Sequence, residues 1–153
     1  MSISMGMAFE KSEQADALLE RAGEAGDYGQ SIPRYLEAIS EICRQLGLKD
    51  LQSFVCQEPD LYEEALEVAE QYGYEEYAES FKDAIEEVKR KQKWFKASEG
   101  LATVRGVLHH MEEKSKHGAK DPGMDGVLSD LRAFERALAA ASSEGVRFHF
   151  WIG

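Results

Sequence analysis

The sequence predicts a mainly α-helical protein. We expect about six helices packed as antiparallel hairpins in one domain over residues 1–153, with a small two-stranded sheet formed by the N- and C-terminal segments. Through most of the chain, apolar residues recur every three to four positions, which is the period of a helix with one buried face. At both ends they occupy every second position, which is the period of a strand. A chain of 153 residues with 43% hydrophobic side chains is long enough to bury a core as one domain.

The N-terminal third is predicted to hold a strand followed by helices. Residues 2–9 alternate small or polar side chains with larger apolar ones, as a strand with one buried face does. Further on, Ser31 can cap a helix, Pro33 is tolerated in its first turn, and Gly47 can end it. Helices are therefore expected over residues 12–25 and 31–46, with a short helix over residues 50–56.

The centre of the chain is predicted to be an acidic pair of helices. Residues 58–88 contain twelve carboxylates and one base, Lys82, so this block carries −11, which equals the formal net charge of the whole chain. In each helix the apolar side chains fall on one arc and the carboxylates fall on the opposite arc. Because Gly73 separates the two segments, we expect an antiparallel hairpin of helices over about 60–72 and 75–93.

The C-terminal third is predicted to hold two helices and a strand. The helices are expected over residues 98–116 and 124–142, with Gly145 ending the second. Residues 146–152 then alternate apolar with polar or aromatic side chains. An isolated strand leaves backbone donors and acceptors unpaired, so we expect the two terminal strands to pair with each other. The alternative is that they pair with a second copy of the chain, which would give a homodimer.

The net charge of −11 limits the classes of partner. A strongly acidic chain is repelled by nucleic acid and by anionic lipid, and it is attracted to basic proteins. The basic stretch 89–96, which contains Trp94 and Phe95, is interpreted as a helix end that complements the helix dipole, with both aromatic side chains in the core. We therefore expect a basic protein partner and neither nucleic acid nor a membrane.

The expected location is the cytoplasm. No apolar run approaches the ~18 residues of a membrane span, and the N-terminal segment has no basic region followed by an apolar one, as a secretory signal would. Cys43 and Cys56 are too few for a disulfide framework in a chain of this size, so both are expected to be inert thiols among apolar neighbours.

No motif assigns a reaction or a cofactor to the chain. The sequence lacks a G-x-S-x-G nucleophile turn, a phosphate-binding P-loop and a G-x-G-x-x-G dinucleotide motif. Carboxylates are abundant, but a catalytic pair needs a shared or buried cleft, and the helical period places these on an exposed arc. We expect a non-catalytic protein without a cofactor.

One set of residues has the spacing of metal ligands. His110, Glu113 and His117 follow one another at i, i+3 and i+7, so a helix would place them on one side, where they could ligate Zn²⁺ or Fe²⁺. That side lies opposite the apolar stripe, and neither H-E-x-x-H nor E-x-x-H occurs in the chain. No metal site is expected, and these three residues are the candidates if a metal binds.

A short segment resembles the second helix of a tetratricopeptide unit. Gly73 and Tyr74 are followed by Phe81, Ala84 and Ile85, and a similar run begins at Gly26. The spacing of the two runs differs from the ~34 residues of that repeat. The resemblance therefore implies helix–helix stacking and not membership of the family.

These observations favour an acidic interaction protein, for example a binder or inhibitor of a basic protein in the manner of an immunity protein or antitoxin. The alternatives are a helical-repeat-like scaffold that binds peptides in a groove, and a metal-binding helical enzyme that uses the three residues above. The carboxylates could also serve only to keep the surface soluble. If the acidic arc is a docking face, its residues are Glu63, Glu67, Glu70, Glu75, Glu79, Asp83 and Glu86.

Overall fold

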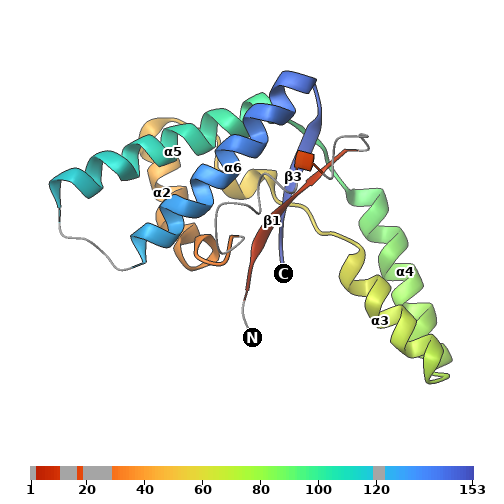
Figure 1. Cartoon of the computed structure of the whole chain (residues 1–153). Helices are drawn as coiled ribbons and strands as arrows, with labels where there is room; N and C mark the ends of the chain where they lie inside the picture. Colours follow the sequence, from red (N-terminus) through yellow and green to blue (C-terminus); the bar gives the residue numbers. More distant parts are fainter. Residues whose placement is uncertain (1–2, 11–16, 19–28, 119–122) are drawn as a thin grey trace. The chain divides into compact units, whose positions relative to one another are not determined.

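The computed structural model describes residues 3–10, 17–18, 29–118 and 123–153 (Figure 1). The chain divides into two compact units. The sheet unit consists of Met1–Val55 and Trp94–Gly153, and the hairpin unit consists of Cys56–Lys93. The expectation of one domain over residues 1–153 stays a prediction.

The fold is mainly α-helical with a small antiparallel sheet, as predicted. The part of the chain that the structure describes contains five α-helices, against the six or so expected. The helix predicted over 12–25 lies outside the described residues, apart from Ala17 and Leu18, which are helical. The elements in chain order are β1 (Met5–Phe9), the 3₁₀ turn η1 (Ile32–Tyr35), α2 (Leu36–Leu46), the 3₁₀ turn η2 (Leu51–Phe54), α3 (Asp60–Gln71), α4 (Glu75–Lys91), β2 (Phe95–Lys96), α5 (Ala97–His117), α6 (Met124–Glu144) and β3 (Arg147–Ile152).

The two terminal segments pair within one chain, as the first of the two alternatives predicted. β1 and β3 are antiparallel, with Met5 opposite Ile152 and Phe9 opposite Phe148. Beyond the strand end, Ser4 and Gly153 exchange both backbone hydrogen bonds. The sheet therefore joins the two ends of the chain through a continuous ladder.

A third strand, β2, was not predicted, because two residues cannot show an alternating pattern. Helix α4 was expected to reach residue 93, but it ends at Lys91, and the backbone of Gln92 is extended. Trp94 and Phe95 therefore leave the helical arc on which they were expected. Phe95 pairs with Phe148 on the other side of β3, so the strand order is β1-β3-β2.

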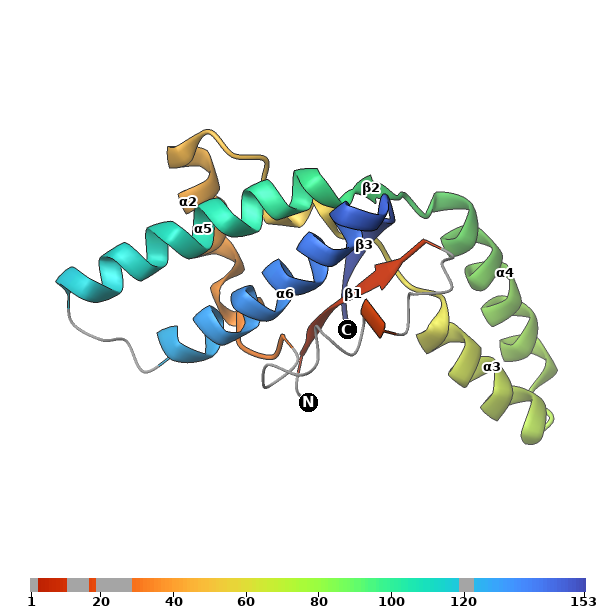
Figure 2. The ribbon, with the colours of Figure 1, turned by 45° about the horizontal axis from the view of Figure 1, so that its top comes forward.

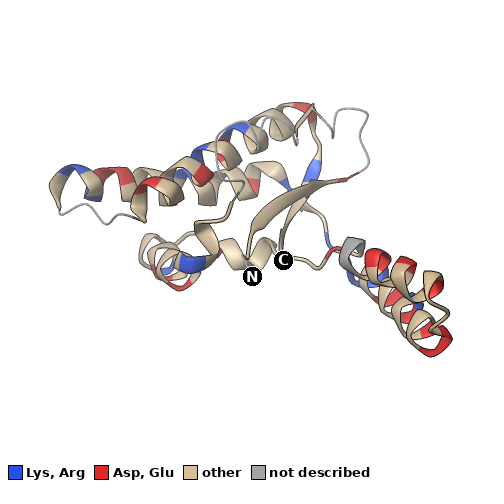
Figure 3. Cartoon of the chain, turned by 60° about the horizontal axis from the view of Figure 1, so that its bottom comes forward, with Lys and Arg blue, Asp and Glu red and all other residues tan. Residues whose placement is uncertain are grey.

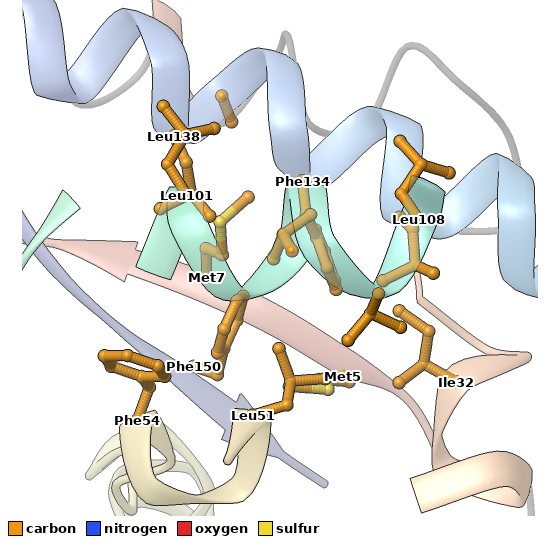
Figure 4. Close-up of a cluster of buried hydrophobic side chains, with 14 of the residues drawn as sticks. Met5, Met7, Ile32, Leu51, Phe54, Leu101, Leu108, Phe134, Leu138 and Phe150 are labelled. Atoms are coloured by element: carbon orange, nitrogen blue, oxygen red, sulfur yellow. The ribbon is translucent and has the colours of Figure 1, made fainter. Parts of the chain in front are cut away.

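One face of the sheet forms the main core of the sheet unit together with α5 and α6, which run side by side (Figures 2 and 4). Phe148 and Phe150 are fully buried on this face. The ring centroid of Phe150 lies 5.1 Å from that of Phe134 in α6, and Phe148 lies 5.6 Å from Phe54 of η2. These aromatic contacts tie strand, helix and turn into one core.

The opposite face of β3 is also covered. His149 is fully buried, and its ring lies 4.4 Å from the ring of Trp94. Trp151 lies over Gly6 of β1, at a position where a Cβ atom on residue 6 would overlap the indole. The strand therefore carries aromatic packing on both faces.

The start of η1 is held by a residue that the sequence did not reveal. Ser31 was expected to cap this segment, but its side chain makes no capping hydrogen bond. Instead, the buried carboxylate of Asp130 in α6 accepts hydrogen bonds from the backbone N–H groups of Ser31 and Ile32, at 3.0 and 3.3 Å. Because a buried carboxylate is costly without partners, these bonds fix the segment against α6.

The hairpin unit is an antiparallel helical hairpin, as predicted. Its connection consists of Tyr72, Gly73 and Tyr74. The N–H of Tyr74 donates to the carbonyl of Ala69 at 2.9 Å, and the N–H of Gly73 donates to that of Glu70 at 3.3 Å. With Gly73 at φ +74°, this is a Schellman ending, which satisfies the last carbonyls of α3 and turns the chain back into α4.

Replacing Gly100 by Ala should destabilise the sheet unit. A Cβ atom at residue 100 would overlap the ring of Phe148, which is fully buried and has no room to move. Overpacking of a core costs about 1–3 kcal/mol, whereas Ala is favoured over Gly in a helix by about 1 kcal/mol. We expect a net loss of roughly 1 kcal/mol in the free energy of unfolding, measured by urea denaturation.

The exposed residue Ala102 on the same helix provides the control. Ala102→Gly isolates the helix-propensity term and should cost about 1 kcal/mol. A Gly100→Ala protein that is more stable than the parent would show that α5 does not pack closely on Phe148.

Replacing Gly73 by Ala should loosen the hairpin through the backbone alone. A Cβ atom at residue 73 meets nothing within 4 Å, so the only cost is the left-handed conformation, about 1 kcal/mol. Gly73→Asn should cost less, because Asn adopts this conformation more readily. The measurement is amide hydrogen exchange of residues 60–91 in the full chain, and equal protection in all three proteins would contradict it.

Candidate functional site

The buried strip between α3 and α4 is narrow. Ala69 of α3 and Ala78, Ile85 and Val88 of α4 are buried, whereas Phe81 is half-buried. Small side chains at Ala69 and Ala78 suit close approach of the two helices. Because one helix covers only one strip of its neighbour, many of the other described side chains of both helices are exposed.

Two ion pairs run along one flank of this strip. The carboxylate of Glu63 lies 3.8 Å from Nζ of Lys89, and that of Glu70 lies 3.8 Å from Nζ of Lys82. The two glutamates are seven residues apart on α3, and the two lysines are seven residues apart on α4. The first glutamate pairs with the second lysine and the second glutamate with the first lysine, as two antiparallel helices require. All four side chains are about half exposed, and such pairs contribute at most about 1 kcal/mol each.

All seven residues of the predicted docking face are exposed. At about 100° per residue, Glu63, Glu67 and Glu70 share one flank of α3, and the acidic residues Glu75 and Glu79 share the matching flank of α4. Figure 3 marks the acidic residues of both helices in red. The docking role of these residues stays a prediction.

The structure divides these seven residues into two groups. Glu63 and Glu70 are engaged by lysines, which the sequence did not reveal because the partners lie on different helices. The other five form no ion pair with any residue that the structure describes: Glu67, Glu75, Glu79, Asp83 and Glu86. They define what we call the acidic ribbon.

Sequence reasoning missed the opposite flank of the hairpin. Val68, Tyr72 and Tyr77 were expected to face the core, but 52%, 66% and 63% of their respective surfaces are exposed. Tyr74 is 58% exposed, and its ring centroid lies 6.3 Å from that of Tyr72 and 6.2 Å from that of Tyr77. We call these four residues the tyrosine tip.

The width of the apolar arc was the available signal for this flank. The apolar residues predicted on one arc of α3 span about half of the helix circumference, which is more than a single neighbouring helix covers. They are Leu61, Tyr62, Ala65, Leu66, Val68, Ala69 and Tyr72. The residues at the edge of such an arc stay exposed when no third helix packs there. Tyrosine tolerates this position because its ring is apolar and its hydroxyl is polar.

The candidate metal ligands do not form a site. The three lie on α5, but Nε2 of His110 is buried and has no hydrogen-bond partner in the described part of the chain, whereas Glu113 and His117 are exposed. Glu113 lies 3.4 Å from Nζ of Lys116. No three His, Cys, Asp or Glu side chains among the described residues are grouped to hold a metal ion.

The two cysteines lie in different surroundings. Cys43 is buried in α2, and this burial raises the pKa of its thiol, as an inert core thiol requires. Cys56 is only half-buried, and its Sγ lies 3.6 Å from the carbonyl oxygen of Lys93. These two residues are the first and the last of the hairpin unit. Both thiols are free.

An open groove of about 520 Å³ lies on the outer surface of α5 and α6. Both acidic and basic side chains line the groove, and most of them form ion pairs with one another. Arg132 lies 3.5 Å from Glu112, and Arg105 lies 3.9 Å from Glu135. Because the carboxylates already neutralise two of its arginines, the groove is a weaker candidate for a ligand site than the hairpin.

The comparisons with known proteins add no assignment. No protein-family model, no curated protein and no solved structure matches this chain. No helix within the described residues is both long and apolar enough to cross a membrane. Function is therefore inferred from the chemistry of the hairpin unit.

Proposed function

We propose that this chain is a non-catalytic binding protein whose hairpin unit docks on a basic surface of another protein. The observation that carries the proposal is the acidic ribbon, whose five exposed carboxylates have no ion pair within the described residues. The hairpin unit holds twelve carboxylates and five bases, a formal charge of −7 out of −11 for the whole chain. A concentrated field of this kind speeds association with basic proteins and selects against acidic ones.

The arrangement of the ribbon supports a role in binding. Glu75, Glu79 and Asp83 follow one another at i, i+4 and i+8 on α4. Each like-charge pair at this spacing costs about 0.2–0.5 kcal/mol, and none of the three residues forms an ion pair with a lysine or arginine among the described residues. A cationic partner surface would relieve the repulsion on binding. By contrast, Glu87 is relieved by Lys91 at 2.8 Å, which lowers the pKa of Glu87.

The proposal extends to the kind of partner. A basic surface of sufficient size is typical of proteins that bind nucleic acid, so one concrete form is a protein that masks such a surface, as an immunity protein or antitoxin does. The same charge argues against direct binding to nucleic acid or to an anionic membrane. A cytoplasmic location belongs to this proposal and agrees with two free cysteines.

Reversing the charge of the ribbon should slow docking strongly. The variant Glu67→Lys, Glu75→Lys, Glu79→Lys and Asp83→Lys should lose at least about 10-fold in association rate toward partners captured from a lysate at low salt and identified by mass spectrometry. Binding of the parent should also weaken as the ionic strength rises from ~0.1 to ~0.5 M.

A matched control separates position from net charge. Reversing Glu37, Glu99, Glu113 and Asp125, four exposed acids of the sheet unit, gives a protein with the same net charge. This control should bind like the parent. If both variants bind as well as the parent, the carboxylates serve solubility alone and the proposal is wrong.

A further inference from the structure

The tyrosine tip is the largest exposed aromatic feature among the described residues. Of the seven large hydrophobic residues that are exposed in the described part of the chain, four belong to it: Val68, Tyr72, Tyr74 and Tyr77. Val68 and Tyr72 are one turn apart at the end of α3, Tyr74 sits in the connection, and Tyr77 is in the first turn of α4. Exposed tyrosines grouped in this way are typical of binding hot spots.

The tip is held in place by the connection between the helices. The Schellman ending at Gly73 fixes the backbone of Tyr72 and Tyr74, which lie on either side of it. The edge-on contact between Tyr74 and Tyr77, with an interplanar angle of 86°, limits how each ring can turn. Pre-ordered rings lose little conformational entropy on binding, which favours affinity.

The charges around the tip select the occupant. Glu64 lies one turn before Val68 on the same side of α3, and Glu75 and Glu76 lie between Tyr74 and Tyr77 in the sequence. All three carboxylates are exposed and form no ion pair within the described residues. A neutral apolar partner would bury them without compensation. A second copy of the chain would be repelled, because each hairpin unit carries a charge of −7.

We propose that the tyrosine tip binds arginine side chains of a cationic segment in a partner protein. A guanidinium group stacks on an aromatic ring and can at the same time donate two parallel hydrogen bonds to a carboxylate. The exposed tyrosine rings offer the stacking surface, and exposed carboxylates of the same hairpin, Glu64 and Glu76 among them, offer the acceptors. Lysine provides the charge without the planar stacking, so the tip discriminates arginine from lysine. This inference rests on the proposed function and adds a specificity that the acidic ribbon alone does not supply.

Two synthetic probes of equal charge test it: an octa-arginine and an octa-lysine peptide, each titrated into the full chain at ~0.1 M salt. The arginine peptide should bind at least about 5-fold more tightly, because a guanidinium group stacks on a ring and donates two parallel hydrogen bonds to a carboxylate, whereas an ammonium group does neither. The amide NMR signals of Tyr72, Tyr74 and Tyr77 should shift with the arginine peptide. Equal affinity for the two peptides would overturn the inference.

Two triple variants separate the effect of the aromatic rings from the effect of their hydrophobicity. Replacing Tyr72, Tyr74 and Tyr77 together by Leu should remove the preference for arginine, whereas replacing all three by Phe should keep it, because Phe retains the ring. If the Leu variant keeps the preference, the inference is wrong. In that case weaker binding of both peptides to the charge-reversed ribbon would still support the proposed function, and no binding of either peptide to the parent would overturn both.

Discussion

Strand β3 is the element on which the rest of the sheet unit depends. It pairs with β1 on one side and with β2 on the other, and Val55 forms a further bridge to Phe150. Its side chains supply the aromatic centre of one face and the buried His149 of the other. Because both Val55 and Phe95 pair with this strand, the chain leaves and re-enters the sheet unit at the same element. The intervening residues 56–93 are therefore an insertion that need not contribute to the main core.

The two amphipathic helices of the hairpin unit cover only a narrow strip of each other. Among the described side chains, Ala69, Ala78, Ile85 and Val88 fill the strip between α3 and α4, and many of the others are exposed. On one flank this leaves carboxylates, partly balanced by Lys82 and Lys89. On the other flank it leaves the tyrosine tip. A hairpin kept only for solubility would not need exposed tyrosines on its second flank, so the two flanks together favour a binding role.

The sequence was sufficient where one local pattern determines the structure. Period-two alternation at both ends predicted β1 and β3, and Gly73 between two apolar arcs predicted the hairpin. It was insufficient where the deciding partner is distant along the chain. The cap on Ser31 and Ile32 comes from Asp130, ninety-eight residues beyond Ile32, and β2 exists only because β3 offers it an edge. The exposed acidic residues could be named from their period. The width of the apolar arc indicated only that part of it stays exposed, because which part does so depends on how many neighbours a helix acquires.

We propose that the hairpin unit, and not the sheet unit, contacts the basic partner. Carbodiimide cross-linking joins lysines to carboxylates that lie in direct contact, so mass spectrometry of a cross-linked complex with a captured partner tests this claim directly. We expect cross-links from partner lysines to Glu67, Glu75, Glu79 or Asp83. Cross-links confined to acids of the sheet unit, such as Glu37, Glu112 or Glu135, would contradict the claim.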